Sequence, residues 1–128
     1  MEEAVVSEIF KELAFSKEEL RWISSKFKKI EIEKHTTLLS PQQKVTHQYY
    51  VYKGCLRTFY IDENNKECTL QFAIKNWWVS DYTSYFTSEK AALNIESIKD
   101  SILFQIEKKD IEELYVKFPK IETFFRKK

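Results

Sequence analysis

The sequence predicts a mainly β domain, a barrel or jelly roll with α-helices before and after it. Apolar residues recur at helical spacing near the N-terminus, change to a spacing of two at Lys28, and return to helical spacing after Ile106. About eight short strands fit between these points, and many short strands are typical of barrels and jelly rolls. A chain of 128 residues, 43% of them hydrophobic, suits one domain with one core.

Two helices are predicted before the first strand. An apolar stripe at helical spacing favours a helix over residues 4–13. Ser16 and Glu19 have the spacing of a capping box, in which each side chain accepts a hydrogen bond from the other residue's backbone amide. A second helix is therefore expected over residues 17–26.

The strands are predicted from alternation and from turn residues. Residues 30–32 carry charges on one face and are expected at the edge of a sheet. Gly54, the only glycine, divides an aromatic and β-branched run over 49–62, which predicts two strands joined by a tight turn. The polar residues 62–66 predict a turn. With a third strand at 67–74, this region is expected to form a three-stranded meander, one wall of an antiparallel sheet. The other strands are expected at 36–39, within 76–81, at 93–98 and at 101–106, with a helical turn at 82–86.

Helical spacing returns after the last strand. It predicts a helix over residues 108–118, and Pro119 is expected to end that helix and to begin another. The last helix carries an apolar stripe of Ile121, Phe124 and Phe125. Such a stripe can dock on the chain's own barrel or pair with a second copy about a two-fold axis, and we expect pairing.

Charge and cysteine content exclude several classes of protein. The formal net charge of +1 lacks the basic footprint of a nucleic-acid binder. The acidic N-terminus differs from a signal peptide, and no apolar run approaches the roughly 18 residues that span a bilayer, so we expect a cytoplasmic protein without a membrane partner. Cys55 and Cys68 fall on predicted strands and are expected to be free thiols rather than a disulfide.

No group of residues predicts catalysis. The two histidines, His35 and His47, lack the paired spacing of a metal site, and no nucleophile or phosphate-loop motif occurs. We therefore expect a protein that is not an enzyme and holds no metal. A small jelly-roll enzyme of the cupin type stays open as an alternative. A second alternative is a stand-alone interaction module that uses Trp77 and Trp78, because neighbouring side chains on a strand point to opposite faces.

Three stretches together resemble a known family. Residues 49–54, 62–67 and 72–81, in this order and spacing, are similar to the cyclic-nucleotide-binding domain of the Crp/Fnr transcriptional regulators. The similarity runs without gaps over about residues 38–106, and the helices on both sides fit.

The resemblance implies a fold and a division of the chain. The fold is a double-stranded β-helix, the cyclic-nucleotide-binding-like form of the jelly roll. This sensor domain, with its N-terminal helices, is expected over residues 1–118. Residues 119–128 are expected to begin a dimerisation-type helix.

The resemblance also implies a phosphate-binding cassette over residues 80–92. In the family, a Gly-Glu pair opens the cassette, and an arginine ten residues later pairs with the cyclic phosphate. Ser80 and Asp81 stand at the first two positions here, and Ala91 stands at the arginine's, beside Lys90. The ligand-binding residues that the resemblance implies, on the cassette and on the strands facing the base, are Thr58, Leu70, Gln71, Ala73, Ser80, Asp81, Tyr82, Lys90, Ala91 and Ala92.

The missing arginine changes the expected ligand. An arginine–phosphate contact is charge-assisted, and the loss of one partner of such a pair costs about 2–5 kcal/mol. We therefore expect little or no binding of cAMP, no certain cofactor, and a nucleotide-like or other small molecule as the effector. The resemblance further implies a homodimer, and DNA contacts only through a helix-turn-helix domain that these 128 residues do not contain.

Overall fold

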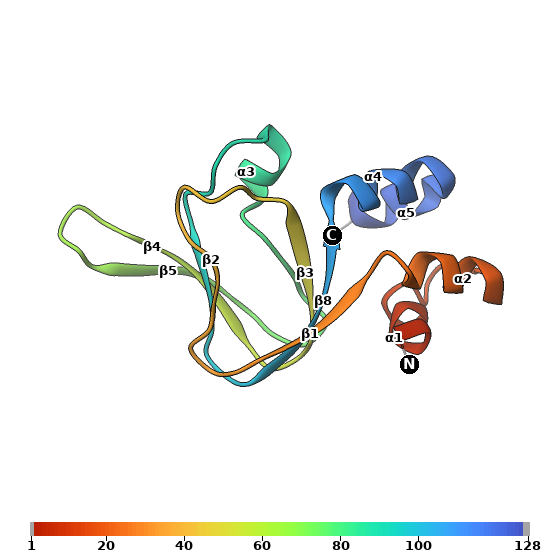
Figure 1. Cartoon of the computed structure of the whole chain (residues 1–128), viewed down its shortest axis with the longest axis horizontal. Coiled ribbons are helices and arrows are strands. Elements are labelled where there is room, and N and C mark those ends of the chain that lie inside the picture. The colour runs from red at the N-terminus through yellow and green to blue at the C-terminus, as the bar shows by residue number, and fades with distance from the viewer. Residues whose placement is uncertain (1, 127–128) are drawn as a thin grey trace. The chain divides into compact units, whose positions relative to one another are not determined.

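The computed structural model describes residues 2–126 and contains two compact units. One unit combines Met1–Lys28 with Ile106–Lys128 and is helical, whereas the other, Lys29–Gln105, contains the body of the β-sheets (Figure 1). None of the described helices has the length and apolar character that a membrane span requires.

The described strands form two four-stranded sheets, with the orders β1-β8-β3-β6 and β2-β7-β4-β5. The mainly β class, with helices on both sides in the sequence, is confirmed, and β1 lies at an edge as expected. In chain order the strands are β1 (Lys28–Ile32), β2 (Thr37–Leu39), β3 (His47–Lys53), β4 (Leu56–Ile61), β5 (Glu67–Ala73), β6 (Trp78–Val79), β7 (Asn94–Ser97) and β8 (Ser101–Glu107).

Gly54 lies at a corner between the two sheets. The strands on either side of it, β3 and β4, belong to different sheets, so the predicted meander over 49–74 is wrong: β3 pairs with β6, whereas β4 pairs with β5 and β7. Gly54 has φ +107°, and a Cβ atom there would lie 2.7 Å from the Cα of Ser101 on β8. The chain passes this close to β8 because glycine has no side chain. The Cys55 amide also donates to Ser101 Oγ at 3.2 Å, which holds the corner.

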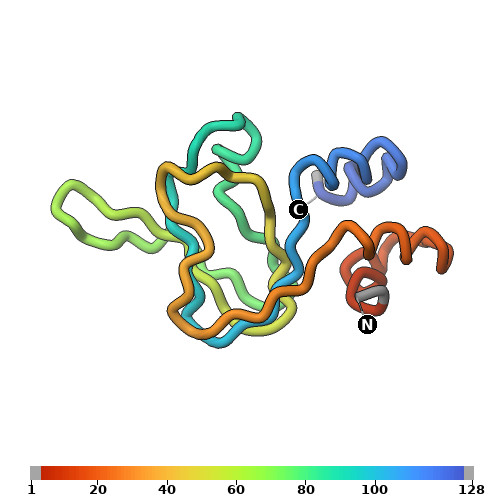
Figure 2. The backbone as a smooth tube through the Cα atoms, viewed as in Figure 1, coloured from red at the N-terminus to blue at the C-terminus, as the bar shows by residue number. Residues whose placement is uncertain are grey.

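The β4–β5 hairpin extends away from the rest of the sheets (Figure 2). Its turn is built around Asp62, whose Oδ1 accepts hydrogen bonds from the amides of Asn64 and Lys66 at 2.8 and 2.9 Å. Asn65 takes the left-handed conformation, with φ 63°, which asparagine tolerates better than most residues. This turn lies where its polar residues predict it.

Both sheets contribute to one core. Val51 on β3 and Leu103 on β8 are fully buried, as are Leu56 on β4 and Ile95 on β7. Burial of such side chains stabilises the fold by about 1.5–3 kcal/mol each. The free thiols expected at the two cysteines are confirmed, with Cys55 buried and the other half-buried.

The predicted helices are found with small shifts. The capping box is confirmed, because the Glu19 amide donates to Ser16 Oγ at 3.1 Å and the Ser16 amide donates to Glu19 Oε1 at 2.8 Å. The helix expected over 4–13 is shorter, since the amides of Lys11 and Leu13 bond to carbonyls three residues back instead of four. The helices of this unit are α1 (Glu2–Ile9), α2 (Lys17–Ser24), α4 (Lys108–Lys117) and α5 (Pro119–Arg126).

The apolar stripe of α5 is covered within the helical unit. Ile121 is fully buried and Phe124 is 7% exposed. The ring of Phe10 packs edge-on against Phe124 and Phe125, with centroids 5.3 and 6.0 Å apart. The stripe is therefore covered within its own unit, by Phe10, which lies more than a hundred residues away in the sequence, and it is not left free for a second copy. The predicted homodimer loses this support and rests on the resemblance.

Candidate functional site

The predicted cassette over residues 80–92 is a short helix with folded-back ends. Its helix, α3 (Tyr82–Thr87), confirms the expected helical turn. Asp81 precedes the helix as its N-cap, and Ser88 ends it in the left-handed conformation with φ 62°. The segment that follows returns beside the start of the cassette, because Ser84 Oγ donates to the Lys90 carbonyl at 3.0 Å.

The Asp81 carboxylate closes the cassette. Its Oδ2 accepts hydrogen bonds from the amides of Ala92 and Leu93 at 2.8 and 3.1 Å, and its Oδ1 caps α3 through the Ser84 amide at 3.4 Å. The side chain is 2% exposed. Charge-assisted hydrogen bonds to a buried carboxylate are among the stronger ones in proteins. The residue expected at the ribose-binding position therefore bonds to the protein's own backbone.

Two other predicted cassette residues are also engaged within the protein. Ser80 Oγ donates to the His47 carbonyl on β3 at 2.8 Å. Ala91, at the position that the resemblance assigns to the arginine, is 1% exposed and exchanges backbone hydrogen bonds with residues 42 and 43. Its amide donates to the Gln43 carbonyl at 2.8 Å, and the Gln42 amide donates to its carbonyl at 2.9 Å. These bonds attach the cassette to the segment between β2 and β3.

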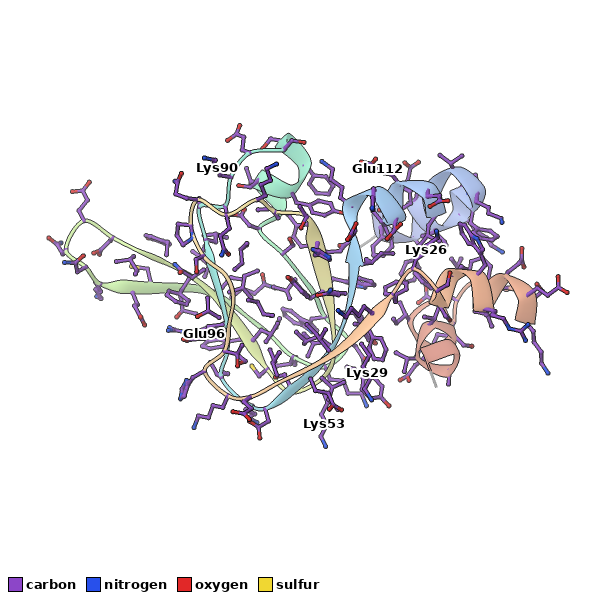
Figure 3. All side chains as sticks on the ribbon, in the orientation of Figure 1. Lys26, Lys29, Lys53, Lys90, Glu96 and Glu112 are labelled. Carbon is purple, nitrogen blue, oxygen red and sulfur yellow. The ribbon has the colours of Figure 1, made fainter. Side chains whose placement is uncertain are left out.

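Lys90 is exposed and lies beside α3 at one end of the sheets (Figure 3). It stands directly opposite Lys44 in an isolated antiparallel β-bridge. Residues directly opposite in such a bridge project to the same side, and like charges there repel. Two lysines are thus placed on one side of the closed cassette.

The structure brings together some of the residues predicted to face the base of a nucleotide. Thr58 on β4 pairs with Gln71 on β5, so their side chains share a face of the sheet. Ala73 on β5 pairs with Leu56 on β4, two positions before Thr58. Ala73 and Thr58 are both buried on that face. Leu70 is left out of the pairing as a bulge, and it is 58% exposed. Leu70 is thereby separated from the other three.

A pocket of about 430 Å³ lies next to the cassette, and the predicted ligand-binding residues do not line it. It is formed by β2, the segment over residues 40–46 and β3, and this segment runs beside α3 in Figure 2. The sequence predicts only a turn in this segment. The one signal that could have pointed to it is the absence of acidic side chains from the longer stretch of residues 34–61 that contains it. The pocket is lined by Leu38, Leu39, Gln43, Lys44, Val45, Thr46, His47 and Tyr49.

The β3 side of this pocket carries two stacked rings. The rings of His47 and Tyr49 lie 6.3 Å apart and nearly parallel. Thr46 Oγ1 and His47 Nδ1 form a hydrogen bond of 2.8 Å. Burial raises the pKa of the Tyr49 phenol above its ordinary value of 10.0, so the phenol is neutral at physiological pH. This wall therefore offers the flat faces of two rings, and the phenol adds no charge to it.

The two tryptophans differ as the alternation predicts. Trp77 is 44% exposed, whereas Trp78 is half-buried and packs against Tyr50 with ring centroids 5.3 Å apart. Among residues 2–126, no three histidine, cysteine, aspartate or glutamate side chains gather in the way a metal ion would require.

One family model matches the chain, and solved structures share its fold. The family model of the cyclic nucleotide-binding domain matches residues 29–118. The catabolite activator protein of Thermus thermophilus superposes with a TM-score of 0.73 at 19% identity, over 87% of this chain and 51% of that one, so the chain spans about half of its length. The sensor domain of the transcriptional regulator DNR from Pseudomonas aeruginosa superposes with a TM-score of 0.79 at 14% identity, over 99% of this chain and 89% of that one.

A third structure of the same fold is the c-di-GMP responsive global regulator CLP of Xanthomonas campestris. It superposes with a TM-score of 0.66 at 16% identity, over 74% of this chain and 45% of that one. At such identities the likeness concerns the fold alone. A comparison with curated protein sequences found no match. The resemblance to the cyclic-nucleotide-binding domain, and with it the β-roll, is confirmed by the family model and by these structures.

Proposed function

Because the chain belongs to the cyclic nucleotide-binding domain family, we propose that it is the ligand-sensing domain of a Crp/Fnr-type transcriptional regulator and that it does not respond to cAMP. The observation that carries the second part is the Asp81 carboxylate, which accepts hydrogen bonds from the Ala92 and Leu93 amides. A carboxylate bonded to these donors leaves them unavailable to the phosphate of a nucleotide.

The position of Ala91 supports the same proposal. The resemblance assigns this position to the arginine that pairs with the cyclic phosphate, and here it holds a buried methyl group between backbone hydrogen bonds to residues 42 and 43. Lys90 next to it is exposed and offers a point charge without the paired donors of a guanidinium. The phosphate of a cyclic nucleotide would thus lack its main cationic partner.

The remaining parts of the proposal concern the whole regulator. The domain is not an enzyme, its effector is a nucleotide-like or other small molecule, and the protein works in the cytoplasm as a homodimer. DNA is contacted only by a helix-turn-helix domain outside these 128 residues. The division into a sensor over 1–118 and the start of a dimerisation helix over 119–128 belongs to the same proposal.

Calorimetry with cAMP tests the proposal directly. We expect no measurable binding at ligand concentrations up to about 1 mM, which corresponds to a binding free energy weaker than about −4 kcal/mol. A micromolar dissociation constant for the unmodified chain would overturn the proposal, whatever any variant does.

Two variants test whether the residue at position 91 is the reason that cAMP does not bind. Ala91→Arg combined with Ser80→Gly restores the family's residues at two positions, and we expect tighter binding of cAMP by tenfold or more. Glu89→Arg is the matched control, because it adds an arginine to the same cassette at an exposed position. Equal gains in both variants would show that added positive charge, rather than the position of Ala91, controls binding. Amide NMR spectra establish that both variants are folded.

A further inference from the structure

We propose that the pocket formed by β2, residues 40–46 and β3 binds a small organic anion with a flat apolar body. This site is separate from the cassette, and it does not depend on whether the cassette takes a cyclic nucleotide. Its volume of about 430 Å³ lies within the usual range for small-molecule sites.

The lining combines an apolar floor with a polar rim. Leu39 and Val45 are buried, at 7% and 8% exposure, and their side chains line the pocket. Gln43, Lys44 and Thr46 line it from exposed positions. An apolar surface with a few polar groups around it is the usual composition of a small-molecule site, since burial supplies affinity and the polar groups fix orientation. The stacked rings of β3 suit a flat ligand body.

The wall of the pocket is held in place before any ligand binds. Gln42 takes the left-handed conformation, with φ 76°, which is uncommon for a residue other than glycine. Its amide and the Gln43 carbonyl are hydrogen-bonded to Ala91, and the Gln43 side chain accepts from the Ser40 amide at 2.9 Å. Strained backbone of this kind persists where surrounding bonds over-determine it, and it is concentrated at binding sites. A preformed wall lowers the ordering cost of binding.

The charge around the pocket favours an anion. Lys44 lines it, and Lys90 faces Lys44 across the β-bridge. The carboxylates nearest in sequence to Lys90 are Glu89, Glu96 and Asp81. Glu89 is exposed, Glu96 is paired with Arg57, and Asp81 is bonded to backbone amides. The stretch of residues 34–61, which includes β2, β3 and β4, contains no acidic residue. An anion between the two ammonium groups would offset their repulsion.

Two dyes with almost the same ring skeleton test the charge requirement. The anionic probe is 8-anilinonaphthalene-1-sulfonate, and the neutral probe is N-phenyl-1-naphthylamine, which lacks the sulfonate. We expect the anionic dye to bind at one site per chain, more tightly than the neutral dye, and to shift the amide NMR signals of residues 38–49. Shifts confined to the exposed β4–β5 hairpin, or equal affinity of the two dyes, would overturn the proposal.

Three variants locate the site. Lys44→Gln should weaken binding of the anionic dye about three- to fivefold, the effect of losing one partly exposed ion pair, and leave the neutral dye unchanged. Lys53→Gln is the matched control, since Lys53 also belongs to β3 but lies at the opposite end of the sheets from Lys90 (Figure 3). Thr46→Trp fills the pocket from an exposed lining position and should abolish binding of both dyes. Equal effects of Lys44→Gln and Lys53→Gln, or full binding by Thr46→Trp, would contradict the proposal.

Discussion

The cassette and the neighbouring pocket use their polar groups in opposite ways. In the cassette, the side chains of Ser80 and Asp81 are buried and bonded to backbone groups of the same chain. In the pocket, Lys44 and Thr46 reach the surface from a wall whose backbone is already fixed. Polar side chains of one short segment are thus consumed by bonds within the chain, whereas those of the neighbouring hollow stay at the surface.

The largest expected effect comes from opening the cassette at Asp81. Asp81→Asn replaces one acceptor oxygen with an amide group that faces the donors of Ala92 and Leu93. The free energy of unfolding should fall by about 2–3 kcal/mol, since buried hydrogen bonds to a charged group are lost and their donors stay unsatisfied. Urea denaturation measures this change.

The matched control for this change is Glu89→Gln. Glu89 lies in the same segment but is exposed, so its substitution should alter the free energy of unfolding by no more than about 0.5 kcal/mol. If Asp81→Asn were as stable as the control, the carboxylate would not hold the cassette closed, and the contrast with the pocket would fail.

A smaller effect is expected where the two regions are joined. Ser80→Ala removes the hydrogen bond of 2.8 Å to the His47 carbonyl, whose residue also lines the pocket. We expect a loss of about 1 kcal/mol in the free energy of unfolding, together with NMR shifts at residues 46–49. Thr83→Ala, at an exposed position in α3, serves as the control. A shift of the cassette signals alone would mean that the two regions are not coupled through this bond.

The smallest effect near neutral pH belongs to Tyr49. Burial raises the pKa of its phenol in the folded state above the ordinary value of 10.0. The unfolded phenol ionises first as the pH rises, so this contribution to stability is complete below pH 10 and is lost as the pH rises through the folded-state pKa. Tyr49→Phe should therefore reduce the loss of stability in alkali without changing stability at pH 7.

Two other tyrosines also contribute to the loss of stability at alkaline pH. The pKa of Tyr60 is raised, first by its hydrogen bond with Cys68, and that of Tyr115 is raised, first by burial. Tyr49→Phe should consequently lessen the alkaline loss rather than remove it. Denaturation at several pH values, with tyrosinate absorbance as the readout, measures this. An unchanged alkaline profile would show that the pocket wall at Tyr49 is hydrated in solution.

Most elements lie where the sequence predicts them, but the pairing of the strands differs from the prediction. The capping box at Ser16 and Glu19, the turn at Asp62 and the start of a helix at Pro119 depend on neighbours within four residues, and they lie where they were predicted. The strand partners at Gly54 were wrong. A lone glycine permits both a hairpin turn and a corner between sheets, and only its close approach to Ser101 selects the corner.

For the candidate site too, one part could be predicted from the sequence and another part could not. The resemblance places Ala91 where the family has an arginine, and this suffices to expect a changed ligand. It does not show that the Asp81 carboxylate turns inward, because its partner amides lie eleven and twelve residues away. Nor does it show the pocket, whose walls are separate strands joined by a segment that reads as a plain turn.

The order and kind of the elements, the family, and the expectation of a missing phosphate partner thus all follow from the sequence. These depend on side-chain period, on short-range caps and on the identity of single residues. The tertiary structure alone decided which strands pair, how the cassette closes, and how Phe10 covers the stripe of α5. The physical reason is that buried polar groups and apolar faces must find partners wherever packing brings them, and sequence distance does not limit that choice.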